Sequence, residues 1–239
     1  MKQNLLLGLL IRLNGLCRKY LYQSPAVARI IFSCNLSSYH GISFFELCTL
    51  IMRRALARYL KSGMRVLEVG AGPYAVLLLW ACKRWALDIT AVEIDGQSVE
   101  SANICTKKNG VQVTILESDL FKNVQGTFDL IWFVPPFIPE HIFIWQLKMF
   151  GIADAGDIER LRKRTCGGEN GWEIINRYYR EAMPLLNEKG MILSVVNLAY
   201  HSDQAWSGII KKQGYRIVDT VGVPFLSYRV YVACRESRP

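Results

Sequence analysis

Apolar positions from residue 44 onward switch between the spacing of helices and the short runs of strands. Strands are predicted at residues 64–69, 88–93, 112–117, 128–133, 190–197, 215–222 and 227–234. Helices are predicted at residues 44–60, 74–84, 97–108, 170–187 and 202–213. The long segment 137–169 follows neither period and is predicted to be irregular. Strands that alternate with helices favour a doubly wound, mostly parallel sheet.

The order of these elements predicts an α/β fold. It is a Rossmann-like sheet of seven strands with helices on both faces, after a short helical N-terminal segment. Residues 128–133 form an almost continuous apolar run, typical of a strand buried on both faces. The last two strands are joined by a short turn at Pro224, so we expect them to pair antiparallel. Ligands of such sheets bind beyond the carboxyl ends of the strands.

The charge of the chain divides it into two regions. The net charge is +9, and residues 1–45 contribute five basic residues and no acid. We therefore separate a basic helical segment, 1–46, from a main domain, 47–239. The leucines between Leu5 and Leu16 have helical spacing, which favours a helix packed on the main domain. A membrane-surface helix and an organelle-targeting segment are the alternatives.

The cysteines and histidines indicate neither a disulfide framework nor a metal site. The chain has seven cysteines, an odd number, with no Cys-x-x-Cys pair, and three scattered histidines. We therefore expect no metal and a reducing compartment, the cytoplasm. The run Leu5–Leu16 is shorter than the roughly 20 apolar residues that span a bilayer, so no transmembrane segment is expected. The oligomeric state is left open.

Residues 66–74 place an acid and two glycines between a predicted strand and a predicted helix. Gly70 and Gly72 allow turn conformations and the close approach of a ligand. Pro73 suits a first helical turn, whose free amides favour an anionic or polar group. Glu68 adds a carboxylate that a phosphate would repel and a cationic amine would attract. The amino group and sulfonium of S-adenosylmethionine therefore fit this turn better than a dinucleotide does.

Two further acids end the next strands. Glu93 lies 21 residues after Gly72, where an acid accepts hydrogen bonds from the ribose hydroxyls of an adenosine. Asp119 lies in Ser118–Phe121, where it can accept from the adenine amino group while apolar neighbours stack on the ring. The structural alternatives are a surface acid for Glu93 and a loop cap for Asp119.

Val134–Phe137 follow the fourth predicted strand. Two consecutive prolines, Pro135 and Pro136, cannot continue a central strand. They fix the backbone, so the carbonyls of Val134 and Pro135 can hold a planar NH2 group, with Phe137 as a flat wall. The structural alternative is a rigid strand exit.

These motifs resemble the class I S-adenosylmethionine-dependent methyltransferases. Within that class the chain is most similar to the protein-(glutamine N5) methyltransferases that modify peptide release factors. The matching segments are Glu68–Gly72, Ala91–Asp95, Ser118–Phe121, Phe128–Ile131, Pro135–Glu140, Gly167–Gly171 and Leu185–Gly190. The double glycine of Gly167–Gly171, after the two prolines, separates this family from the wider fold. The resemblance implies S-adenosyl-L-methionine as cofactor and an enzyme that transfers a methyl group.

Strand ends and resemblance together predict two groups of site residues. The residues expected to bind the cofactor are Glu68, Gly70, Ala71, Gly72, Tyr74, Glu93, Ile94, Asp119 and Leu120. The residues expected at the acceptor are Val134, Pro135, Pro136 and Phe137. Methyl transfer from a sulfonium needs alignment and the exclusion of water, and no nucleophilic side chain.

The chain departs from the family at Val134, where the family has Asn, Asp or Ser and uses its side-chain oxygen to accept from the target nitrogen. Three functions follow. The first is N-methylation of an amide or amine of a protein or small molecule, with nucleic acid allowed but not required. The second is N-methylation of RNA or DNA bases. The third is a non-catalytic module that keeps the S-adenosylmethionine fold and binds a partner.

The basic run Arg160–Arg164 lies in the segment after the prolines. It is either a solvated helix face or a docking site for an acidic partner, an RNA or an acidic group of the substrate.

Overall fold

A single seven-stranded sheet organises the protein. The computed structural model describes residues 18–36, 42–224 and 226–236. The strands lie in the order β3-β2-β1-β4-β5-β7-β6. Their bounds are β1 (Arg65–Val69), β2 (Asp88–Glu93), β3 (Thr114–Glu117), β4 (Phe128–Phe133), β5 (Leu186–Asn197), β6 (Tyr215–Gly222) and β7 (Tyr228–Arg235). β1 to β5 pair parallel, and β7 is antiparallel to both β5 and β6. The predicted α/β fold and its antiparallel last pair are confirmed.

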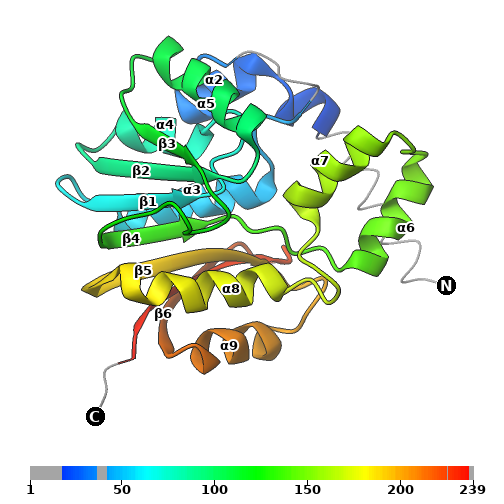
Figure 1. Cartoon of the computed structure of the whole chain (residues 1–239). Helices are drawn as coiled ribbons and strands as arrows, with labels where there is room; N and C mark the ends of the chain where they lie inside the picture. Colours follow the sequence, from blue (N-terminus) through cyan, green and yellow to red (C-terminus); the bar gives the residue numbers. More distant parts are fainter. Residues whose placement is uncertain (1–17, 37–41, 225, 237–239) are drawn as a thin grey trace.

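Helices cover both faces of this sheet (Figure 1). α3 (Leu47–Tyr59), α4 (Val76–Cys82) and α5 (Gly96–Lys108) pack on one face, and α8 (Glu173–Ala182) and α9 (Asp203–Lys212) on the other. A 3-10 turn, η2 (Met183–Leu185), joins α8 directly to β5, so the predicted helix 170–187 is too long and the predicted strand 190–197 too short.

The segment 137–169, predicted to be irregular, contains two helices. α6 (Glu140–Phe150) and α7 (Ala155–Thr165) form a hairpin beyond the carboxyl ends of the strands (Figure 1). α7 has no buried residue, so the sequence lacks the apolar stripe by which helices are found. Its N-cap is a local signal, since the side chain of Asp154 accepts from the N–H of Asp157 at 2.9 Å.

The residues before α3 add to the same core. They form a π-helical turn, η1 (Arg18–Tyr22), and α2 (Pro25–Phe32), which packs on α4. Ala28 and Phe32 of α2 are fully buried in the hydrophobic core that the sheet and its helices share. The division at residue 46 stays a prediction, and the run Leu5–Leu16 lies outside the described residues. Within the described ranges no helix is long and apolar enough to cross a membrane.

Tyr178 of α8 ties two central strands together. Its buried hydroxyl is 2.9 Å from the carbonyl oxygen of Leu193 on β5 and 3.3 Å from that of Ile131 on β4. Burial raises the pKa of this phenol well above its usual value, so the hydroxyl is a permanent donor.

We expect Tyr178→Phe to lower the free energy of unfolding by about 1–3 kcal/mol, because buried carbonyls lose a donor that water cannot replace. Urea unfolding followed by circular dichroism measures this change. Ile104→Val, at a side chain on the surface of α5, is the control and should change the value by less than about 0.5 kcal/mol. Equal losses in the two variants would contradict the role of the buried hydroxyl.

Candidate active site

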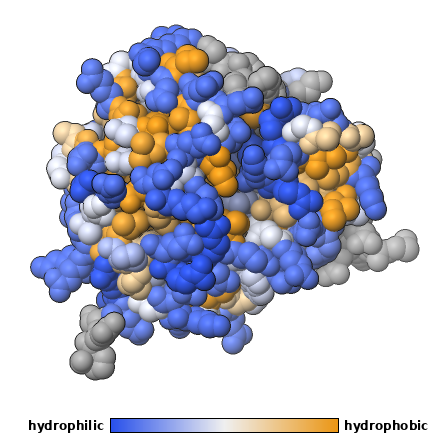
Figure 2. Space-filling view, in the orientation of Figure 1, coloured by the Kyte–Doolittle hydropathy of each residue, from blue (hydrophilic) through white to orange (hydrophobic). Residues whose placement is uncertain are grey.

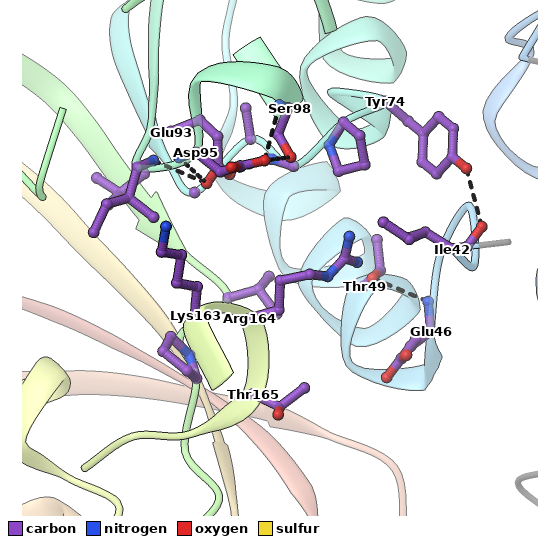
Figure 3. A pocket seen from close by; sticks show the side chains of 18 of the residues that line it. Ile42, Glu46, Thr49, Tyr74, Glu93, Asp95, Ser98, Lys163, Arg164 and Thr165 are labelled. Carbon is purple, nitrogen blue, oxygen red and sulfur yellow. Dashed lines mark hydrogen bonds between the residues drawn. The ribbon is translucent and has the colours of Figure 1, made fainter. Parts of the chain in front are cut away.

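A cavity of about 540 Å³ opens at the carboxyl ends of β1, β2 and β4. Its walls come from the glycine turn after β1, the starts of α3 and α5, the exits of β3 and β4, and the cavity-facing side of α7. Figure 2 shows hydrophilic residues over α7 beside this hollow, and Figure 3 shows side chains of the lining. The volume suits one small organic ligand.

The glycine turn is held by the end of β2. The N–H groups of Gly70 and Ala71 donate to the carbonyl oxygen of Val92 at 2.8 and 3.1 Å, and that of Gly72 donates to Glu93 Oε2 at 2.8 Å. Gly72 has φ +64°, and a Cβ added to it would meet nothing within 4 Å. The turn therefore presents open backbone to the cavity while its amides are bonded inside the protein.

Glu93 is engaged before any ligand binds. Besides Gly72, its Oε1 accepts from the N–H groups of Ile94 at 2.8 Å and Asp95 at 3.2 Å. Burial raises the pKa of this carboxyl, and the three backbone donors and the charge of Arg164 oppose the rise. Three donors leave one of the four acceptor positions of a carboxylate for a ligand hydroxyl.

Glu68 is the most deeply buried acid of the cavity. It is 3% exposed, and its Oε2 has no hydrogen-bond partner among the described residues. Burial raises the pKa of the Glu68 carboxyl to about 8, although the indole of Trp132 on β4 and a backbone hydrogen bond from Leu78 in the first turn of α4 favour the charged form. A buried carboxyl with a free acceptor atom calls for a cationic or donating group.

The two carboxylates decide which ligand the turn accepts. A pyrophosphate would need the amides of the turn and of the helix start, but Val92, Glu93 and Glu68 already hold them. Pro73 also lies in the turn rather than in the first turn of α4, which begins at Val76, so the expected free helix start is absent here. An amine fits where an anion does not.

Asp119 has a protein partner that the sequence did not reveal. Its two carboxylate oxygens accept from the two Nη atoms of Arg177 at 3.1 and 3.2 Å, and Lys122 lies 3.3 Å away. These cations, Arg177 first, hold the pKa of Asp119 below its usual value. Arg177 lies on α8, 58 residues further along the chain. An adenine amino group would have to share Asp119 with it.

The other predicted cofactor residues also reach the cavity. Its lining includes Ala71, Tyr74, Ile94 and Leu120. The hydroxyl of Tyr74 donates to the carbonyl oxygen of Ile42 at 3.0 Å, and its ring packs edge-on against Phe44. Leu120 has φ +51°, a strained value for a branched side chain, and such strain is typical of binding sites.

Val134 and Pro136 line the cavity, and Val134 is half-buried. Phe137 does not: its ring is 8% exposed and packs against Tyr200 and Tyr228 at centroid distances of 6.1 and 6.0 Å. The ring of Phe137, expected to be a flat wall for a planar NH2 group, therefore packs within an aromatic cluster and does not face the cavity.

The double glycine packs directly on the proline segment. The N–H of Ile138 donates to Thr165 and the N–H of Gly167 to Ile138, at 2.9 and 3.0 Å. A Cβ on Gly167 would come within 2.8 Å of the Pro136 carbonyl oxygen, and one on Gly171 within 2.7 Å of that of Phe137. Only glycine allows this approach, which fixes the carbonyls after β4.

α7 supplies cavity residues that sequence reasoning left undecided. Arg160, Lys163 and Arg164 line the cavity together with Leu161. The sequence shows the basic run, but only the fold shows which of its side chains face inward. Residues of the α3 start, Phe44, Phe45 and Thr49, also line the cavity, and no motif in the sequence marks them.

Comparison with known proteins agrees with this geometry. Residues 49–155 match the model of the methyltransferase small domain. A candidate protein N5-glutamine methyltransferase of Methanocaldococcus jannaschii is 30% identical over 172 residues, 71% of this chain and 81% of that protein. A ribosomal protein L11 methyltransferase of Thermotoga petrophila is 34% identical over 134 residues, 51% of this chain, which spans only 48% of that relative.

Solved structures show the same fold. The crystal structure of a methyltransferase from Pyrococcus furiosus superposes with a TM-score of 0.66 at 21% identity, covering 94% of this chain and 99% of that one. The sheet order, the carboxylate-lined glycine turn and the double-proline exit define an enzyme that binds S-adenosylmethionine. The chain belongs to the class I S-adenosylmethionine-dependent methyltransferases.

We expect Gly167→Ala to displace the proline segment, because the new methyl group would be wedged between the carbonyl oxygens of Gly171 and Pro136. The midpoint temperature of thermal unfolding should fall by several degrees, and hydrogen exchange at the backbone amide of Ile138 should become faster. Gly208→Ala is the control, since a Cβ there meets nothing within 4 Å and α9 gains a better helix former. An unchanged exchange rate at Ile138 in the Gly167 variant would show that the packing of Gly167 does not fix the proline segment.

Proposed function

We propose that this enzyme methylates a nitrogen of an amide or amine acceptor, in a protein or a small molecule. The observation that carries the proposal is the double-proline exit of β4. Val134 and Pro136 line the cavity. Gly167 and Gly171 pack against the carbonyls of Pro136 and Phe137, so the segment that carries the Val134 and Pro135 carbonyls is fixed from its C-terminal side. Carbonyls fixed in this way can accept the hydrogens of an NH2 group and leave its lone pair directed toward a methyl donor.

The same proposal assigns the cofactor residues. Glu68 would take the amino group of S-adenosylmethionine, since its buried Oε2 needs a donor. Glu93 would accept from the ribose with its remaining acceptor position, and Asp119, oriented by Arg177, would lie at the adenine. Gly72 would let the cofactor lie against bare backbone. When bound, the cofactor supplies an electrophilic methyl group on sulfur, so this chain needs to orient the acceptor and exclude water.

The relatives support the class of acceptor. The name of the Methanocaldococcus protein gives a glutamine nitrogen, and that of the Thermotoga protein a ribosomal protein. Val134 separates this chain from the release-factor enzymes, because its side chain offers no acceptor to an amide. We infer a reshaped acceptor pocket in which Val134 contacts an apolar or aromatic edge.

Label transfer tests the proposal. The enzyme is incubated with 13C-methyl S-adenosylmethionine and a panel of primary amides and amines, including a release-factor peptide with its glutamine. Mass spectrometry should find the label on nitrogen. A short RNA and a set of phenols and thiols complete the panel. Label only on a base, an oxygen or a sulfur would overturn the assignment, as would cofactor binding with no transfer from a panel extended to cell extract.

Glu68 should make cofactor affinity depend on pH. Its carboxyl, with a pKa of about 8 in the free protein, must lose its proton to bind a cationic amine. Affinity for S-adenosylhomocysteine should therefore rise by up to about tenfold per unit between pH 6 and pH 7.5. Isothermal titration calorimetry measures it.

Two controls isolate the Glu68 carboxyl. In Glu68→Gln the pH dependence should flatten and affinity fall by about tenfold or more at pH 7.5. Methylthioadenosine, which lacks the amino group, should bind the native protein with little dependence on pH. The same slope for both ligands would assign the titration to another group.

Val134→Asn should change which acceptor the enzyme methylates. On a glutamine peptide we expect methylation to rise from undetectable to a weak signal, because a hydrogen bond of about 1 kcal/mol is restored. On the acceptor preferred by the native enzyme, activity should fall several-fold, because an amide is buried without a partner. Val134→Leu, which has the shape of Asn without its polar atoms, is the matched control. Strong activity of the native enzyme on the peptide would show that Val134 does not alter specificity.

A further inference from the structure

Three cations of α7 line the cavity opposite the glycine turn. Arg160, Lys163 and Arg164 have the i, i+3, i+4 spacing of one helix face, and all three border the cavity. Figure 3 shows Lys163 extending from α7 toward Glu93 and Asp95, and Arg164 extending toward the side of the cavity that carries Thr49 and Ile42. The fourth cation of the run, Arg162, binds Glu140 and lies 5.3 Å over the ring of Phe143, away from the cavity.

The position of this face is fixed. Arg162 joins α7 to α6, and the backbone bonds of Ile138 with Thr165 and Gly167 join the end of α7 to the proline segment. Thr165 directly follows Arg164, so the cationic face begins one residue from the contact that positions Pro136. An acceptor at the carbonyls of β4 would lie beside these cations.

The net charge of the cofactor does not call for three cations. S-adenosylmethionine carries a sulfonium, an ammonium and a carboxylate, a net positive charge, which three cations repel. Arg160 pairs with Asp157, which also lines the cavity, and Lys163 pairs with Glu159 of the same helix, at side chains that are 38–60% exposed. Such exposed pairs are weak and exchange readily for a better anion.

We propose that the cavity face of α7, formed by Arg160, Lys163 and Arg164, binds an oxyanion of the methyl acceptor, a carboxylate or a phosphate. The acceptor is then a small anionic molecule whose reacting nitrogen lies near that oxyanion. The reacting nitrogen rests on the proposed function, whereas the anion site does not. A nucleic acid is disfavoured, because the aromatic ring after the prolines, Phe137, packs against Tyr200 and Tyr228 instead of offering a stacking surface.

Calorimetry on the whole protein, saturated with S-adenosylhomocysteine and at constant ionic strength, tests the site with pyrophosphate and with citrate as probes. At least one probe should bind, and the preferred probe tells phosphate from carboxylate. The double variant Lys163→Gln/Arg164→Gln should weaken binding by about tenfold or more. The control Lys211→Gln/Lys212→Gln removes the same charge from the exposed end of α9 and should bind as the native protein does.

Each remaining outcome decides the matter. The cofactor affinity of the double variant should stay the same or rise, and a loss would show that the cations serve the cofactor. Should that variant fail to fold, Arg160→Gln alone should still weaken the probe several-fold. No binding of either probe, an equal loss in the α9 control, or binding of a 12-nucleotide RNA in place of both probes would overturn the proposal. Methyl transfer to oxygen would overturn the proposed N-methylation and leave the anion site standing.

Discussion

A buried carboxyl without a full set of partners governs the site. Glu68 is the penultimate residue of β1, and burial makes its charged form unfavourable. The neighbouring strand end repeats the pattern, since Glu93 is buried but holds three backbone amides. Glu93 thereby fixes the glycine turn, whereas Glu68 keeps a free oxygen that could pair with a cationic group of a ligand. The turn of a dinucleotide site, which offers amides to phosphate, is here converted into one that offers carboxylate to an amine.

A second constraint couples the acceptor side to the cofactor side. Gly167 and Gly171 touch the backbone of the proline segment, and the same stretch ends α7. A shift of this stretch would therefore move the carbonyls after β4 and the cationic face of α7 together. A substitution in the double glycine would move both, whereas a substitution in α7 would change only the charge. In the proposed reaction, this packing would set where the acceptor lies, and the cations of α7 would select an acceptor that carries an anionic group.

The sequence predicted what depends on neighbouring residues and missed what depends on distant ones. Strand runs and the glycine turn gave the sheet, because buried parallel strands are continuous apolar segments. The α6–α7 hairpin was missed, because α7 buries no residue and so has no apolar period. The pairing of Asp119 with Arg177, and of Glu93 with Gly72, joins residues 58 and 21 positions apart. Phe137 was read as exposed to the ligand, since the sequence cannot show that Tyr200 and Tyr228 enclose it.

The unfavourable features of the cavity argue for a functional site rather than a relic of the fold. Glu68 lacks a partner for Oε2, Leu120 and Ala75 hold positive φ angles, and α7 sets three cations along one wall. A buried carboxyl without a full set of partners and a positive φ outside glycine each cost free energy in the free protein. They lie around one cavity, where the amino group of the cofactor would offset the Glu68 carboxyl and an anionic acceptor would offset the cations. Val134 fits that arrangement. The charged residues of the cavity would bind the acceptor, and an apolar contact with Val134 would restrict the orientations in which it can bind.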